Sequence, residues 1–447
     1  MTRTPSVTRQ ISRLATAVAA GFALLTLSGC KLAEVFNMSG PQSTMVTAGP
    51  VAKSQWDLFM VTVYVTTFIF IVTGAVLAYA QIKFRAKSEA DEHAEPPAEA
   101  GHGNPLVEIG LIAGSVLLLA FIAIPTVQGI WYTHDVPEAE KGSAIEVNAT
   151  GYQWWFKFEY PNELVQLPNN GGEAPLVTGN ELVVPAGVAV RVNLRTIDVI
   201  HSFWIPKLAG KVDMMPNRAN HLWFKADQPG YFYGQCAEYC GESHAIMKFR
   251  VIALSQEDYA KWLANQKQPA RSVTAQSLQA EASTPRPQFA SLKDTAPGST
   301  IGSSPEFDLN PFAGWQAKQQ VGPGENAALI NEGRKLFQAN QCVNCHTVRG
   351  HEGGGVTAPD LTHIGARTSI AAGVLENSAE RLHQWLKNPE YFKPGNKMVH
   401  GIGAMAGYLK LDEKNRPLKD PNGGYVRNIN LTDAEIDALV AYLHSLK

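Results

Sequence analysis

The fold and the chemistry of this chain depend most on one stretch, Gln235-Cys236-Ala237-Glu238-Tyr239-Cys240-Gly241-Glu242-Ser243-His244-Ala245-Ile246-Met247. It holds two thiols, one imidazole and one thioether. Sulfur ligands combined with imidazole favour copper or zinc over hard cations. A mononuclear blue-copper site uses a single Cys, so here one Cys is in excess. Two thiolates can instead bridge two coppers, each of which takes one His and one weak axial ligand.

A dinuclear site needs a second imidazole from elsewhere in the chain. His201, in Asp198-Val199-Ile200-His201-Ser202-Phe203-Trp204-Ile205-Pro206, is the candidate. Two alternatives stay open: a disulfide between Cys236 and Cys240 beside an ordinary core Met, and a structural zinc site. Export would permit the disulfide, but a disulfide does not require His and Met at this spacing. Copper is therefore the preferred interpretation.

Short apolar runs alternate with turn residues on both sides of this stretch. The turns include Asn169-Asn170-Gly171-Gly172 and Pro229-Gly230. This pattern is typical of an antiparallel sandwich or barrel, and we predict such a domain over residues 133–265. The runs are 144–149, 181–184, 189–194, 221–224 and 248–253.

Two uncharged segments precede the predicted β domain, residues 58–80 and 109–132. As helices each would be about 35 Å long, enough to cross a hydrocarbon core of about 30 Å. We predict a transmembrane hairpin with helices over 56–82 and 106–132. Residues 83–105 would form its cytoplasmic loop. Two buried core helices are the weaker alternative. Charged residues make up only 17% of the chain, which agrees with a membrane anchor, and the net charge of −2 gives no support for nucleic acid as a partner.

The N-terminus has the features of an export signal. Three arginines precede the uncharged run 14–27, and Leu27-Ser28-Gly29-Cys30 follows it. This arrangement predicts a signal peptide over 1–29. It resembles a bacterial lipobox, which implies that Cys30 carries lipid; an uncleaved anchor is the alternative. Residues 30–55 and everything from about residue 133 onward would then lie outside the cytoplasm, at the bacterial inner membrane.

A second chemical motif, Cys342-Val343-Asn344-Cys345-His346, is the attachment sequence of c-type haem. Each Cys would form a thioether to a vinyl group, and His346 would be an axial iron ligand. A redox dithiol with an adjacent His is the alternative. Helical patterns surround the motif, so we predict an all-α haem domain over 323–447. One helix is expected over 325–338, and Thr432 with Glu435 would cap the last one.

The region after the motif resembles class I cytochromes c in two places. Lys393-Pro394-Gly395-Asn396-Lys397-Met398 is similar to their distal loop, which implies Met398 as the second axial ligand, although Val399 stands where Pro is usual. Met405 is the second choice and His400 the third. Ala358-Pro359-Asp360-Leu361 resembles the segment whose Pro carbonyl orients the proximal His. We expect His351 and His363 at the surface.

Residues 266–322 are rich in Ser, Ala, Pro, Gln and Thr without periodicity. We predict a flexible linker there. It would tether the haem domain near the copper domain, where weak, transient contact would suffice for electron transfer. Rigid docking of the haem domain is the alternative.

Residues from about 50 to 265 resemble subunit two of haem–copper cytochrome c oxidases. Four features carry the likeness: the two helices, Gly151-Tyr152-Gln153-Trp154-Trp155-Phe156, the run around His201 and the stretch containing Cys236. The resemblance implies a cupredoxin-like Greek-key barrel and a dinuclear copper A centre. Its implied ligands are His201, Cys236, Cys240, His244, Met247 and the backbone carbonyl of Glu238.

The resemblance implies further roles. The Glu238 carboxylate would also touch a magnesium ion at the boundary with subunit one. Trp154 would pass electrons to the copper; a buried aromatic of the barrel is the alternative. Glu108 matches the carboxylate at the mouth of a proton path, although Gly110-Leu111-Ile112-Ala113-Gly114 departs from the family pattern, and a mere interfacial charge is equally possible.

The whole chain is thus identified as similar to a caa3-type subunit two with a fused cytochrome c. Its expected partners are oxidase subunits one and three, membrane lipid, and an electron donor such as cytochrome c or an upstream bc complex. A quinol-oxidase subunit would have lost the copper ligands. A nitrous-oxide-reductase-like enzyme would need a large catalytic domain. A copper-storage or copper-delivery lipoprotein would not explain the haem motif.

Overall fold

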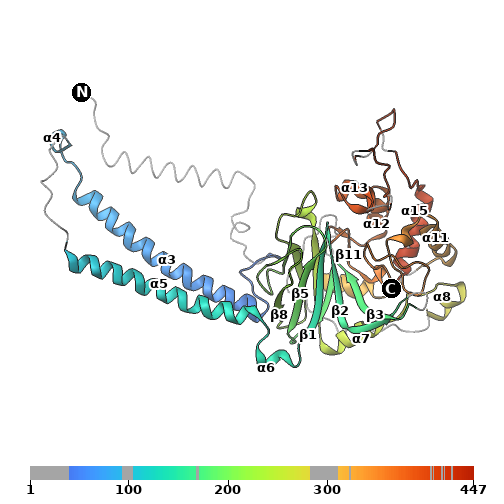
Figure 1. Cartoon of the computed structure of the whole chain (residues 1–447), viewed down its shortest axis with the longest axis horizontal. Coiled ribbons are helices and arrows are strands. Elements are labelled where there is room, and N and C mark those ends of the chain that lie inside the picture. The colour runs from blue at the N-terminus through green and yellow to red at the C-terminus, as the bar shows by residue number, and fades with distance from the viewer. Residues whose placement is uncertain are drawn as a thin grey trace.

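The computed structural model describes residues 40–92, 104–167, 171–281, 311–321 and 324–447, apart from 403–404, 406, 414–415, 417 and 424–425. The predicted signal peptide and Cys30 lie outside the described residues. Figure 1 shows a pair of long helices at one end, a β-sandwich in the middle and a helical domain at the other end.

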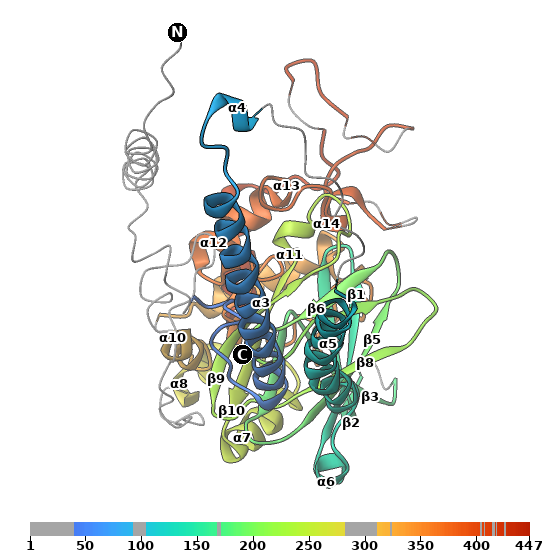
Figure 2. The same ribbon diagram turned by 90° about the vertical axis from the view of Figure 1, so that its left-hand side faces the viewer.

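Two long helices form the first part of the molecule. They are α3 (Pro50–Lys83) and α5 (Pro105–His134), which run side by side in both Figure 1 and Figure 2. The Asn104 side chain caps α5 by accepting the Leu106 N–H at 3.0 Å. Apolar side chains on both helices are exposed, with Phe70 at 78% and Leu106 at 79%. Helices that are apolar and unburied over such a length are suited to lipid rather than to a protein core.

Two five-stranded sheets make the β-sandwich. One sheet has the order β3-β2-β1-β5-β8 and the other β4-β10-β9-β6-β7. All five predicted apolar runs fall on strands, so the predicted sandwich is confirmed. The sheets are mixed rather than purely antiparallel, because β1 pairs with β5, and β10 with β4, in parallel. The strands are β1 (Ile145–Tyr152), β2 (Trp155–Gln166), β3 (Glu173–Gly179), β4 (Glu181–Pro185), β5 (Val190–Thr196), β6 (His201–Trp204), β7 (Val212–Met214), β8 (Asn220–Phe224), β9 (Gly230–Cys236) and β10 (Lys248–Leu254).

Four phenylalanines join the two sheets beneath the copper stretch. Phe156 and Phe158 come from β2 of one sheet, and Phe203 and Phe249 from β6 and β10 of the other. The ring of Phe249 lies 4.8 Å from that of Phe156 and 4.7 Å from that of Phe203, centroid to centroid. All four are fully buried. Aromatic contacts of this kind add to the burial of apolar area, and they fix β6 relative to β10.

The C-terminal part is helical, as expected. The first helix, α11 (Ala327–Ala339), packs across the last, α15 (Asp433–Ser445). A Cβ added to Gly333 would lie 2.0 Å from the Ala438 carbonyl oxygen, so the close crossing requires glycine. The predicted capping box of Thr432 and Glu435 is present. The remaining elements are η3 (Cys342–Asn344), η4 (Ile364–Ala366), β11 (Ser369–Ile370), β12 (Leu375–Glu376), α12 (Ala379–Lys387), α13 (Pro389–Phe392) and α14 (Lys397–His400).

The described parts of residues 266–322 are more ordered than their composition indicates. They include the short helices α8 (Ala275–Glu281) and α10 (Pro311–Lys318), after α7 (Gln256–Gln266). Ala270 and Val273 are buried in the haem-domain core, whereas Trp315 is buried in the core of the sandwich. Isolated apolar residues in a polar segment produce no periodic pattern, so this packing could not be predicted from the sequence.

Candidate copper and haem sites

The predicted copper ligands lie together at one end of the second sheet, at the start of β6 and in the segment between β9 and β10. Cys236 ends β9, Met247 immediately precedes β10, and His201 begins β6. The short helix η2 (His244–Ile246) turns the chain between the sulfur ligands. Because β6 pairs with β9, the pairing of Phe203 with Cys236 brings His201 to the same end of the sheet as the cysteines.

Two sets of donors can be distinguished around the two sulfurs. The Sγ of Cys236 lies 3.9 Å from Nδ1 of His201 and 3.3 Å from the carbonyl oxygen of Glu238. The Sγ of Cys240 lies 3.6 Å from Nδ1 of His244 and 3.8 Å from Sδ of Met247. Each sulfur therefore has one imidazole and one weak donor beside it. Two metals bridged by both sulfurs would each require such a set.

The sulfur–sulfur distance separates the alternatives. The Sγ atoms of Cys236 and Cys240 are 3.8 Å apart, and both cysteines are free. A disulfide requires about 2.05 Å. The distance is shorter than two metal–thiolate bonds of about 2.3 Å each, so one ion can contact both sulfurs. His201, Cys236 and Cys240 also form a buried cluster whose donor atoms all lie within 4.8 Å of one another. The donor set thus fits a bridged soft-metal centre.

The two thiols share a proton. The hydrogen bond between the two sulfurs lowers the pKa of Cys236 and raises the pKa of Cys240. One thiolate is therefore available at neutral pH, and a thiolate is the form that binds metal.

Asp198 holds the His201 ring by its Nε2 atom, whereas Nδ1 faces the sulfur of Cys236. Its Oδ1 lies 2.8 Å from Nε2 of His201, and its Oδ2 accepts the Gln153 N–H at 2.7 Å. Burial lowers the pKa of His201, but the bonds to Asp198 and Cys236 outweigh burial and raise it overall. With Nε2 engaged by the carboxylate, Nδ1 is the atom left for metal, an arrangement common at metal-binding histidines. We assigned no role to Asp198 from the sequence, although its spacing three residues before His201 was a usable signal.

Trp154 contacts the copper loop directly. Its indole N–H and the side-chain amide of Gln153 both donate to the carbonyl oxygen of Cys240, each at 2.9 Å. Trp154 is only 6% exposed. The indole therefore lies one hydrogen bond away from a predicted copper ligand.

The haem motif lies at the end of α11. Cys342 is in η3 and Cys345 follows it directly. Nδ1 of His346 lies 2.7 Å from the carbonyl oxygen of Pro359, as the resemblance to cytochromes c implies. Burial lowers the pKa of His346, which keeps the ring neutral. A neutral ring that donates from Nδ1 offers Nε2 to a metal, so His346 fits an iron ligand.

The three candidates for the distal ligand differ in surroundings. Met398, in α14, packs against the core of the haem domain. The Sδ of Met405 lies 4.0 Å from Sγ of Cys345, beside the attachment motif. His400 is the weakest candidate because its Nε2 lies 3.2 Å from the carboxylate of Glu390. Both methionines therefore stay candidates.

Two histidines that we expected at the surface are buried, and that expectation was wrong. His351 is 7% exposed, and its Nδ1 lies 2.9 Å from the Tyr442 hydroxyl. His363 is 4% exposed, and its Nε2 lies 3.1 Å from the carbonyl oxygen of Gln268. Their polar partners are remote in sequence, so local sequence could not reveal them. Both rings are structural parts of the haem domain.

The other predicted site residues have fewer contacts. Glu108 is exposed in the first turn of α5. The side chain of Glu238 is half-buried.

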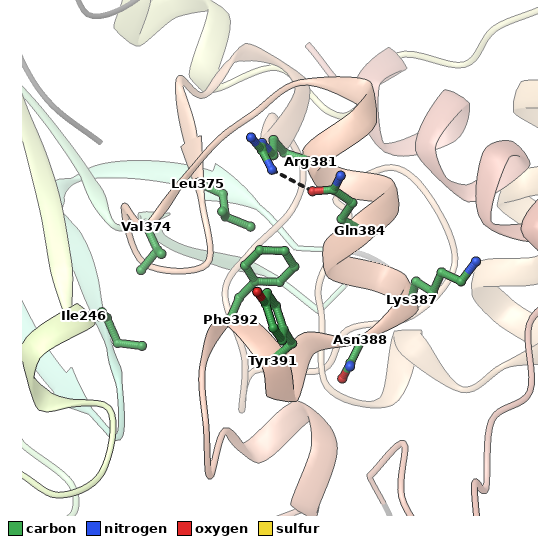
Figure 3. A pocket seen from close by; sticks show the side chains of 9 residues that line it. All are labelled: Ile246, Val374, Leu375, Arg381, Gln384, Lys387, Asn388, Tyr391 and Phe392. Atoms are coloured by element: carbon green, nitrogen blue, oxygen red, sulfur yellow. Dashed lines mark hydrogen bonds between the residues drawn. The ribbon is translucent and has the colours of Figure 1, made fainter. Parts of the chain in front are cut away.

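A cavity of about 700 Å³ opens where the two domains meet, and none of the candidate ligands lines it. In Figure 3, Ile246 of the copper loop stands opposite Val374 and Leu375 of the haem domain, while the rings of Tyr391 and Phe392 lie between them and α12. The cavity therefore marks the border between the domains.

Comparison with known proteins gives two family matches. The periplasmic domain of cytochrome c oxidase subunit II matches residues 145–254, and cytochrome c matches residues 330–447. Cytochrome c oxidase subunit 2 of Alkalihalophilus pseudofirmus is 30% identical over 428 residues, covering 95% of each chain. That of Bacillus subtilis is 30% identical over 437 residues, also covering 95% of each. Quinol oxidase subunit 2 of Bacillus cereus is 32% identical over 253 residues, 56% of this chain and 79% of that protein.

Proposed function

The chain belongs to the cytochrome c oxidase subunit 2 family, with a cytochrome c domain fused at its C-terminal end, and from this we propose that it is the electron-accepting subunit of a bacterial respiratory oxidase. Electrons would pass from a donor to the haem domain, then to a dinuclear copper A centre, and finally to a partner subunit that reduces oxygen to water with proton translocation. The chain would serve the oxidase as a redox subunit, without the oxygen-reducing site.

The paired donor sets around Cys236 and Cys240 carry this proposal. Copper bound there would supply a one-electron centre whose bridging thiolates share the charge, so little rearrangement accompanies its reduction. His201 and His244 would each hold one metal, with Met247 and the Glu238 carbonyl as weak axial donors. Asp198 would keep the His201 ring in place. The indole of Trp154, which donates to the Cys240 carbonyl, would pass electrons from the haem domain to the copper.

For the haem, we propose attachment at Cys342 and Cys345, with His346 as the proximal ligand and Met398 as the distal one. Bound haem would supply a second one-electron centre. The Pro359 carbonyl would hold the His346 ring with Nε2 directed to the iron. A methionine distal ligand raises the potential and suits electron transfer.

The intact ligand set also separates this function from that of a quinol-oxidase subunit. Such a subunit shares the helices and the sandwich but lacks the copper ligands. Here both cysteines, both histidines and Met247 meet within one cluster. A copper-delivery lipoprotein would leave the haem domain without a role.

The partner surfaces follow from the same arrangement. Apolar side chains beside the copper ligands are exposed, and we propose that they contact oxidase subunit one; they are Ile197, Val199, Ile200 and Tyr239. The Glu238 carboxylate would reach a magnesium ion at this boundary. The helices would hold the chain in the bacterial inner membrane, where Glu108 could serve a proton path and subunit three would complete the complex. Lipid on Cys30 would add a second anchor.

Metal analysis of the purified full-length chain tests the function. We expect two coppers and one iron per chain, a near-infrared copper band and a c-type haem spectrum. Cys240→Ser should abolish the near-infrared band and leave the haem spectrum unchanged. Cys345→Ser, the matched control, should alter the haem spectrum and leave the copper band intact. A single copper, or zinc alone, in folded protein would refute the dinuclear assignment.

A further inference from the structure

The haem domain and the copper domain meet loop against loop. The Ser243 hydroxyl, next to His244, donates to the Pro394 carbonyl oxygen at 2.6 Å. Lys393, the residue before Pro394, donates from Nζ to the carbonyl oxygen of Ile246 at 3.0 Å. The loop that leads to Met398 is therefore hydrogen-bonded to the loop that holds Cys240, His244 and Met247.

Gly395 allows this close contact. Its φ is +72°, and a Cβ there would lie 2.7 Å from Oε2 of Glu242 and 3.0 Å from the Trp154 ring. Glycine alone tolerates both the backbone conformation and the approach. The haem-domain loop consequently lies against the six-membered ring of Trp154, the residue that donates to the Cys240 carbonyl.

Lys393 is buried in this contact with its charged end inside. It is 4% exposed, and its second acceptor is the Ala371 carbonyl oxygen, at 3.4 Å. Both acceptors are neutral, and among the residues that the structure describes no carboxylate pairs with it. An ammonium buried without a counter-charge costs several kcal/mol. A negative charge close by would offset this cost.

Lys393 donates to the carbonyl of Ile246, the residue before Met247, so its charge lies beside the proposed copper ligands. Burial lowers the pKa of Lys393 to about 7, and Lys248 adds to the lowering, whereas Cys240 and Cys236 oppose it. The haem domain thus contributes a cation to the surroundings of the copper ligands.

We propose that Lys393 is a positioning residue of the copper centre, contributed by the haem domain, whose positive charge raises the reduction potential of the copper. Reduction adds negative charge to the centre, and a nearby cation favours that state. Docking of the haem domain would then do more than shorten the distance between donor and acceptor. It would also make transfer from haem to copper more favourable. This inference rests on the proposed copper A function.

Redox titration of the full-length chain at pH 6, where Lys393 is charged, tests the inference. Copper is followed in the near-infrared and haem in the visible. Lys393→Met keeps the length of the side chain and removes the charge. We expect a lower copper potential and an electron equilibrium shifted toward haem, on the order of tenfold. Lys397→Met, four residues further along and exposed at the start of α14, is the matched control and should shift it far less.

Three outcomes would overturn the role of Lys393. The first is an unchanged copper potential in Lys393→Met, and the second is an equal shift in the Lys397→Met control. The third is an equal shift in Thr368→Val, which weakens a different part of the domain contact without changing charge; the shift would then come from undocking. Absence of copper bands in the unaltered chain would instead refute the proposed function. The two failures are thus distinguishable.

Discussion

Two thioethers, those of Met398 and Met405, are candidates for the distal position on the proposed haem iron. Met398 has the family resemblance, and Met405 lies beside Cys345. We predict that Met398→Leu abolishes the weak methionine-to-iron absorption band of the oxidised domain and lowers the haem potential, because a thioether ligand stabilises the reduced iron. Met405→Leu is the matched control and should preserve the band. If only Met405→Leu removes it, Met405 is the ligand.

Residues that are close in sequence were the easiest to predict. Cys236, Cys240, His244 and Met247 share one loop, so their chemistry could be inferred before their positions were known. His201 was predicted because a bridged site needs a second imidazole. Lys393 could not be predicted, because its role depends on the docking of two domains that the sequence leaves unspecified.

At the scale of helices, the haem domain contains buried histidines on and around its last helix, α15. His351 lies against Tyr442 of α15, with the two rings stacked 5.8 Å apart. His444, on α15, lies 3.1 Å from the Asn377 side-chain oxygen through Nε2. Burial lowers the pKa of His351, His363 and His444 from 6.5 to about 4 in each case. All three are therefore neutral in the folded domain at neutral pH.

This burial predicts acid instability of the haem domain. Below about pH 6.5 the unfolded chain takes up protons on these rings, and the folded chain does not until about pH 4. The free energy of unfolding should thus fall as pH falls through this window, by up to about 1.4 kcal/mol per pH unit for each histidine. Thermal unfolding followed at the haem band, from pH 7 to 4.5, measures the slope. His351→Gln, which keeps a polar side chain, should reduce it; an unchanged slope would contradict the prediction.

Element prediction succeeded where a periodic pattern was present. The five apolar runs of the sandwich and the capping box of α15 were read correctly because each depends on residues within one segment. The region 266–322 was not, because Trp315 and Ala270 are held by cores formed elsewhere in the chain. Low apolar content predicted a tether, yet the described ends of the segment are packed.

At the scale of the molecule, the sandwich lies between the helix pair and the haem domain (Figure 1). The contact between the sandwich and the haem domain buries charged groups. The Glu181 carboxylate, 5% exposed, accepts the Thr368 N–H at 2.6 Å. The fully buried guanidinium of Arg250 donates to the Gly373 carbonyl oxygen at 2.9 Å. Buried charged groups with defined partners fix one orientation more strongly than a wet, transient contact does. We therefore favour fixed docking over a loose tether.

Fixed docking makes a prediction about transfer from haem c to copper A after flash reduction in the intact oxidase. The rate should not depend on enzyme concentration, because donor and acceptor share one chain. A Gly/Ser block inserted between Glu281 and Pro311 should leave the rate unchanged, because the docked surfaces and not the linker length hold the domains together.

Thr368→Val keeps the shape of the side chain but removes its hydroxyl bonds to Tyr231 and Glu181, so it should slow transfer several-fold. In that variant the inserted block should slow transfer further, since a weakened contact must re-form from the tethered state. A rate that rises with enzyme concentration would show transfer between molecules. If the insertion slows transfer in the otherwise unaltered chain, fixed docking is wrong and the linker acts as a loose tether.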